Sequence, residues 1–193
     1  MAMKTTLTVL VPVYNEETLV AQSLRRLKIL GKSPLLKWVQ VIVVDDASSD
    51  SSPQVLQRFA KAEGRGGRMR WEFHRHPGNQ GKGAAIRTAL ARAEGEITVV
   101  HDADLEYHPE DILLMLKPFL EDNAEAVYGS RFQAREYRRV LFFRHELGNK
   151  LLTFLSNLFS NLNLTDMETC YKAIKTPLFK SIPLGSCIRK LLL

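Results

Sequence analysis

Two carboxylates one residue apart, Asp102 and Asp104, follow directly on the apolar run Ile97 to Val100. Side chains alternate along a strand, so the end of such a strand would present both carboxylates on one side. Two negative charges held so close repel each other unless a cation lies between them. Oxygen ligands of this kind suit a hard divalent ion such as Mg2+ or Mn2+. A solvated acidic turn is the alternative, and the Asp-x-Asp spacing alone does not decide between the two.

Two more polar clusters follow apolar runs in the same way. The run Leu7 to Val13 leads into Asn15-Glu16, and the run Trp38 to Val44 leads into Asp45-Asp46. The carboxyl ends of parallel strands meet at one edge of a sheet, which is where such sheets bind ligands. The sequence therefore predicts that the three clusters converge on one site.

The elements that must position these clusters alternate between strand and helix patterns. Strands are predicted over residues 7–13, 38–44, 70–74, 96–100 and 124–128. Helices are predicted over residues 18–30, 84–93 and 109–120, the first ending at Gly31. A further helix is predicted to begin after residues 48–50, which can cap it. This order predicts an α/β fold, with a mostly parallel sheet and helices on both faces.

A glycine-rich loop, residues 78–83, comes before the third of these helices. Its backbone amides and Lys82 could hold a diphosphate, although a plain tight turn is an equal alternative. It is not a Walker A loop, because Gly83 stands where Ser or Thr must bind magnesium. This argues against a P-loop-like NTPase.

Composition fits one soluble globular domain of 193 residues, with 45% hydrophobic and 25% charged residues. The net charge of +6 suits anionic partners such as phosphates, anionic lipid or nucleic acid, and selects none of them. Aromatic stacking platforms for single-stranded nucleic acid are not evident, so no nucleic-acid partner is predicted. Cys170 and Cys187 have no metal-ligand spacing, which favours a reducing cytoplasmic setting. No apolar run reaches the roughly 20 residues that span a bilayer.

Residues 131–164 form a basic and amphipathic segment. Six cations are opposed there only by Glu136 and Glu146: Arg131, Arg135, Arg138, Arg139, Arg144 and Lys150. The following stretch, 147–164, is rich in Leu and Phe. The pattern fits a membrane-surface element or a phosphate clamp, and equally a core helix with a solvated basic face.

The motifs taken together are more specific than any one of them. Pro12 to Glu16, Val44 to Ser48, Asn79 to Gly83 and Asp102 to Asp104 occur in this order at the predicted strand ends. This combination resembles family 2 glycosyltransferases of the GT-A fold, and within them the polyprenyl-phosphate glycosyltransferases, the group of dolichyl-phosphate mannose synthase. The segments 105–107, 129–132 and 166–172 extend the resemblance, which covers roughly residues 7–175.

The resemblance implies a nucleotide-diphospho-sugar donor and a metal-dependent, inverting transfer. Eight residues would bind the donor: Pro12, Tyr14, Glu16, Asp46, Lys82, Asp102, Ala103 and Asp104. Asp102 and Asp104, with Glu106 as a further ligand, would bind the Mg2+ or Mn2+ that bridges the diphosphate. Simple packing of Tyr14, helix capping by Asp46 with Ser48, and a solvated Glu106 are the structural alternatives.

The resemblance also implies a polyprenyl-phosphate acceptor at the cytoplasmic face of a membrane. Arg131, with Arg139 or Arg144, would hold the acceptor phosphate, because forked guanidinium groups suit that task. Asp166 would act as base or orient the acceptor, unless it only caps the segment that follows. Catalysis would thus involve Asp166, Asp104 and Arg131.

Residues 1–175 are predicted to form the GT-A catalytic domain, and 176–193 an atypical tail that does not look like the family continuation and would fit a truncation. The sugar (mannose, glucose or N-acetylglucosamine), the base (GDP or UDP) and homo-oligomer formation stay open. A nucleotide-sugar-binding module without turnover is the alternative function.

Overall fold

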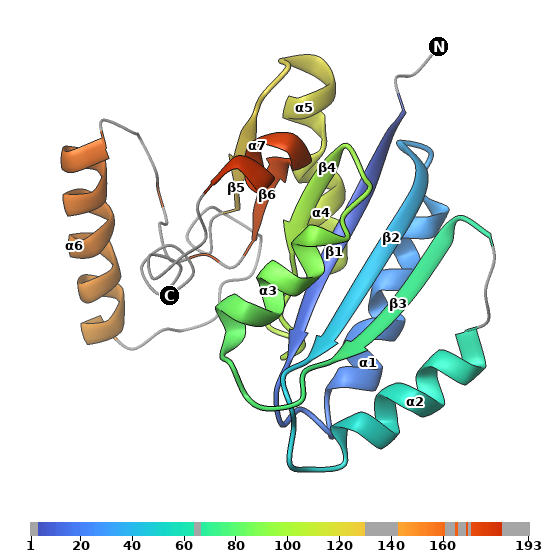
Figure 1. Ribbon diagram of the computed structural model, residues 1–193. Coiled ribbons are helices and arrows are strands. Elements are labelled where there is room, and N and C mark those ends of the chain that lie inside the picture. The colour runs from blue at the N-terminus through green and yellow to red at the C-terminus, as the bar shows by residue number, and fades with distance from the viewer. Residues whose placement is uncertain are drawn as a thin grey trace.

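The computed structural model describes residues 4–63, 67–129, 143–160, 165, 169 and 171–182. The strands of these residues form one sheet in the order β3-β2-β1-β4-β6-β5 (Figure 1). The strands are β1 (Thr5–Val13), β2 (Leu36–Asp45), β3 (Met69–Arg75), β4 (Ile97–Val100), β5 (Ala126–Tyr128) and β6 (Lys172–Lys175). The helices are α1 (Val20–Leu27), the 3-10 helix η1 (Lys28–Lys32), α2 (Ser52–Glu63), α3 (Lys82–Ala91), α4 (Pro109–Met115), α5 (Lys117–Glu121), α6 (Phe143–Ser160) and α7 (Thr176–Ser181).

The parallel part of the sheet brings the predicted clusters to one edge. β1 lies between β2 and β4 and is parallel to both, with Leu10 opposite Ile42 and Val100. β2 is also parallel to β3. The chain therefore leaves β1, β2 and β4 at the same edge of the sheet, and the predicted α/β fold is confirmed.

Helices cover both faces of the sheet, as predicted. One face buries alternate β1 residues such as Val9 and Val11 against apolar side chains of α1, α2 and α4. The other face buries Leu10 and Ile42 against α3 and against Phe179 of α7. Because strands covered on both sides need apolar residues in both directions, β1 and β2 are almost wholly buried.

Strand β6 was not predicted from the sequence. It is only four residues long and pairs antiparallel with β4 on one side and β5 on the other. Val99 of β4 lies opposite Ala173, so β6 begins at the edge where β4 ends. Tyr171, which precedes β6, is thereby brought to the same edge as the predicted site.

Two predicted helices differ in detail from those observed. The helix predicted over 109–120 is divided into α4 and α5, because Pro118 in the first turn of α5 has no N–H to bond to the preceding turn. The helix predicted over 18–30 is α-helical only from Val20 to Leu27 and continues as η1 through Gly31, which is not a stop there.

Candidate functional site

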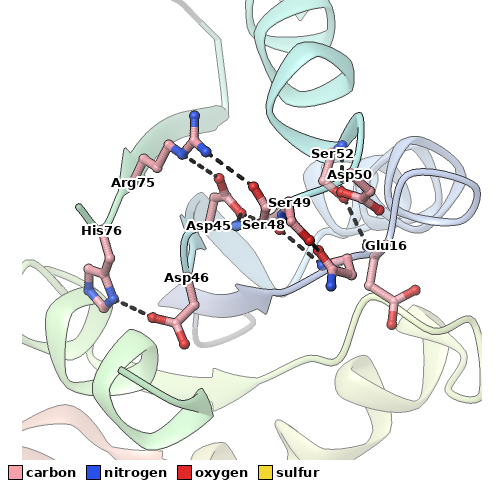
Figure 2. Close-up of polar contacts among 10 residues, drawn as sticks. Glu16, Asp45, Asp46, Ser48, Ser49, Asp50, Ser52, Arg75 and His76 are labelled. Carbon is pink, nitrogen blue, oxygen red and sulfur yellow. Dashed lines mark hydrogen bonds and ion pairs between the residues drawn. The ribbon is translucent and has the colours of Figure 1, made fainter. Parts of the chain in front are cut away.

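Hydrogen bonds join the loop after β1 to the loop after β2 (Figure 2). The amide of Asn15 donates to the Ser48 hydroxyl at 2.9 Å, and the amide of Glu16 donates to the Ser52 hydroxyl at 2.8 Å. In return the Asn15 side-chain oxygen accepts from the Ser49 amide at 2.9 Å. The backbone that carries Tyr14 and Glu16 is therefore fixed by the second loop.

Asp45 and Asp46 are both buried at the end of β2 but have different partners. One oxygen of Asp45 accepts from the amide and hydroxyl of Ser48, and the other lies 3.1 Å from the Arg75 guanidinium. Figure 2 shows the two carboxylates pointing to opposite sides, Asp45 toward Arg75 and Asp46 toward His76. Asp45 therefore stabilises the turn after β2, and Asp46 is directed toward the glycine-rich loop.

Asp46 holds the glycine-rich loop by direct hydrogen bonds. Its Oδ1 accepts from the Gln80 amide at 3.0 Å and from His76 Nδ1 at 2.7 Å, and its Oδ2 accepts from the Gly81 amide at 2.6 Å. Burial alone would raise the pKa of the Asp46 carboxyl, but these donors outweigh it and hold the pKa below its usual value. The other ring nitrogen of His76 lies 2.8 Å from Thr88 Oγ1 on α3.

Gly81 is the residue that turns this loop into α3. It has φ 88° and ψ 158°, a conformation that L side chains rarely adopt, and it is the N-cap of α3. Lys82 follows in the first turn, and its ammonium lies 2.9 Å from an oxygen of Asp102. The loop thus places a cation beside Asp102, the first of the three predicted metal ligands.

The two carboxylates after β4 lie in a strongly negative setting. Burial raises the pKa of the Asp104 carboxyl, and the charges of Asp102 and Glu106 add to the increase. Burial and the charges of Asp104, Asp50 and Asp102 likewise raise the pKa of Glu16. These raised pKa values mean that a cation bound here would relieve repulsion among the carboxylates.

These loops enclose a cavity of about 450 Å³ at the carboxyl edge of the sheet. Its lining includes all eight residues predicted to bind the donor: Pro12, Tyr14, Glu16, Asp46, Lys82, Asp102, Ala103 and Asp104. Tyr14 is half exposed there, which leaves its ring accessible from the cavity side. A larger cavity of about 850 Å³ contains none of them, because it lies at the opposite edge beside Lys37, Glu96 and Lys175.

Residues 8–182 match a protein-family model described as Glycosyl transferase family 2. The chain belongs to this family. It is 24% identical over 181 residues to the UDP-N-acetylglucosamine–dolichyl-phosphate N-acetylglucosaminyltransferase of Methanococcus voltae, covering 89% of this chain and 70% of that protein. It is 34% identical over 136 residues to the undecaprenyl-phosphate 4-deoxy-4-formamido-L-arabinose transferase of Proteus mirabilis, covering 70% of this chain and 39% of that protein.

Solved structures show that the fold of this family 2 chain is GT-A. The glucosyl-3-phosphoglycerate synthase of Mycobacterium tuberculosis with Mn2+, UDP and phosphoglyceric acid matches with a TM-score of 0.66 at 18% identity, over 93% of this chain and 58% of its own. A mannosyltransferase of Pyrobaculum calidifontis with GDP-Man and Mn2+ matches with a TM-score of 0.61 at 20% identity. The match covers 93% of this chain and 47% of the mannosyltransferase chain. The chain thus spans about half of the length of these two solved chains.

The carboxylates of Asp102 and Asp104 fit a metal ion that is held jointly with a substrate. Among the described residues, no three His, Cys, Asp or Glu side chains gather as a complete ligand set. Glu106 is exposed, and its amide donates to Asp104 Oδ1 at 3.1 Å. Its role as a further metal ligand stays a prediction. Two carboxylates are nevertheless the usual protein share for Mg2+, whose other ligands are waters and substrate phosphates.

The structure does not describe the side chains of the predicted acceptor residues. Arg131, Arg139 and Asp166 lie outside the described residues, and Arg144 is in the first turn of α6 with a side chain that is likewise outside them. Their predicted roles therefore stay predictions.

Sequence reasoning gave no role to His101, which the structure places in the core beside the site. The ring lies 3.1 Å from Ser23 Oγ on α1 and 2.9 Å from Tyr171 Oη. Burial lowers the pKa of His101 to about 4, so the ring is neutral at pH 7. The only signal in the sequence was its position next to Asp102, because both partners are more than 60 residues away.

Proposed function

We propose that this domain transfers a sugar from a nucleotide-diphospho-sugar to a polyprenyl phosphate. The observation that carries the proposal is the cavity in which all eight predicted donor residues meet. Membership of glycosyl transferase family 2 supports the reaction class. The names of the dolichyl-phosphate and undecaprenyl-phosphate transferases among its relatives support the acceptor class.

The donor diphosphate would lie between the glycine-rich loop and the end of β4. Lys82 would contribute a positive charge, and Asp102 and Asp104 would hold Mg2+ or Mn2+ against the phosphates. When bound, the metal ion would supply positive charge to the nucleoside-diphosphate leaving group. Because Asp46 fixes the amides of Gln80 and Gly81, its contribution to donor binding would be the shape of this loop.

The acceptor phosphate would be held by Arg131 with Arg139 or Arg144, and Asp166 would orient it or take its proton. A phosphate oxygen would attack the anomeric carbon while the bond from that carbon to the diphosphate breaks. A phosphate is already largely ionised near pH 7, so positioning and electrostatics would supply most of the rate. In-line attack gives a β-linked sugar from an α-linked donor.

The acceptor implies a membrane surface, which we propose is its cytoplasmic face, and α6 has the character to contact it. Six large apolar side chains in the described part of the helix are exposed: Leu151, Leu152, Phe154, Leu155, Leu158 and Phe159. On the opposite side of the helix Thr153 is buried, so the polar side faces inward and the apolar side outward. Figure 1 shows α6 standing apart from the other helices. Among the described residues, no helix has the length and apolar character needed to cross a bilayer.

Transfer assays test the proposal and name the sugar. Radiolabelled GDP-mannose, UDP-glucose and UDP-N-acetylglucosamine are offered in parallel with a short polyprenyl phosphate and Mn2+, beside the variant Asp104→Ala. Lipid-linked product from one donor, lost with EDTA and in the variant, is the expected result. The resemblance to dolichyl-phosphate mannose synthase predicts GDP-mannose as the donor, whereas the name of the Methanococcus relative points to UDP-N-acetylglucosamine. Donor binding by calorimetry without product from any donor would refute transfer and favour a binding module.

A further inference from the structure

A buried hydrogen bond joins the strand that carries the metal ligands to the antiparallel end of the sheet. His101 extends β4, because its amide donates to the Leu10 carbonyl at 2.9 Å, and Asp102 follows it directly. Its ring lies between the hydroxyls of Ser23 and Tyr171 at 3.1 and 2.9 Å. All three side chains are at most 2% exposed, so water does not compete for these contacts.

Tyr171 contacts two further segments at the edge of the site. Its ring packs on Tyr107 with 4.5 Å between the ring centres, and Tyr107 belongs to the loop that follows Asp104. Its carbonyl accepts from the Gly129 amide at 2.8 Å, just after β5. The chain at Gly129 and Tyr171 approaches closely here. A Cβ on Gly129 would lie only 3.1 Å from the Cβ of Tyr171.

The hydroxyl of Tyr171 serves as the hydrogen-bond partner of His101, a role that packing alone does not require. A phenylalanine would fill the same volume and make the same contact with Tyr107, but it would leave a buried nitrogen of His101 without its partner. An unpaired buried polar group is unfavourable, so the ring would move to find another partner. Asp102 is the next residue, and any such movement would be passed to the carboxylate.

We propose that the hydrogen bond between Tyr171 and His101 sets the position of Asp102 and Asp104 for binding a metal–diphosphate complex. Tyr171 is then a positioning residue, with no contact to the substrate. This inference rests on the proposed function, because it concerns the metal part of donor binding. It assigns a task to Tyr171, which lies in the segment 166–172 but was given no role from the sequence.

The test compares nucleotide affinity with and without metal. Calorimetry measures UDP and GDP binding in Mn2+ and again in EDTA, for the wild type, for Tyr171→Phe, and for the control Tyr128→Phe. Tyr128→Phe also removes one hydroxyl, but from β5, where the Tyr128 ring lies 5.6 Å from the Lys172 ammonium. We expect Tyr171→Phe to lose about tenfold of the Mn2+-supported affinity, to change less than twofold in EDTA, and to lower kcat more than the donor KM changes. The control should resemble the wild type.

A second variant separates positioning from folding. The triple substitution Ser23→Ala, His101→Leu and Tyr171→Phe removes the ring together with both of its hydroxyl partners, so stability should recover relative to Tyr171→Phe while the Mn2+-supported affinity stays low. Equal losses of affinity in Mn2+ and EDTA, or none in either, would overturn the inference. If the wild-type affinity for UDP and GDP is the same in Mn2+ and EDTA, both the proposed metal site and this inference are refuted. If Mn2+ raises that affinity but no sugar is transferred, only the proposal of sugar transfer is refuted.

Discussion

Replacing Asp46 by asparagine tests what this carboxylate does. It accepts three hydrogen bonds, from the amides of Gln80 and Gly81 and from His76, and it is 2% exposed. Asparagine keeps one accepting oxygen and turns an NH2 group toward a donor. A hydrogen bond to a buried charged group contributes about 1.5–3 kcal/mol. We therefore expect Asp46→Asn to lower the free energy of unfolding by about 2–3 kcal/mol and to weaken nucleotide binding, because the glycine-rich loop loses its anchor.

Two measurements distinguish this anchoring from a direct contact with the donor. Urea denaturation gives the free energy of unfolding, and calorimetry gives UDP and GDP affinity in Mn2+. The control Glu121→Gln makes the same change of charge at an exposed residue beside the opposite cavity. Weaker nucleotide binding at unchanged stability would refute the anchoring argument and leave Asp46 as a donor contact. Unchanged stability and affinity together would refute both roles.

Three further predictions concern the loops and the core. Gly81→Ala should destabilise the protein by about 1–3 kcal/mol in thermal or urea unfolding because its φ of 88° disfavours a Cβ, whereas Gly78→Ala should stay within about 0.5 kcal/mol since open space surrounds it. Gly95→Ala should cost about 1–3 kcal/mol, because its Cβ would meet the Thr8 backbone nitrogen at 2.6 Å, and a soluble variant of wild-type stability would contradict this. Burial lowers the pKa of His101 from 6.5 to about 4, so the folded state binds fewer protons than the unfolded state between these values. Unfolding free energy should therefore fall as pH drops from 6.5 to 4, by up to about 1.4 kcal/mol per unit, and urea titrations with His101→Leu should show a shallower fall.

The convergence of the predicted donor residues on one cavity could be predicted from the sequence, because each cluster follows a strand of the parallel sheet. Once β1, β2 and β4 are recognised as parallel neighbours, the positions of Glu16, Asp46 and Asp102 at one edge follow from topology. The prediction failed where partners come from distant parts of the chain. The contact between His101 and Tyr171 spans 70 residues and depends on β6, whose four residues are too short for a clear strand pattern.

The shape of the cavity depends on backbone that residue preferences would not predict. Among the described residues, Asn15, Ala47 and Leu105 have φ of 55°, 58° and 63°, and each follows the end of a strand at this edge. Asparagine tolerates this conformation, but alanine and leucine do not favour it, and such strain persists only where the surroundings enforce it. The hydrogen bonds between the first two loops supply that enforcement at Asn15 and beside Ala47, and the Arg26 guanidinium donates to the Leu105 carbonyl at 3.3 Å. The turns are therefore held by tertiary contacts before any ligand binds, which favours a preorganised cavity over one assembled by its ligand.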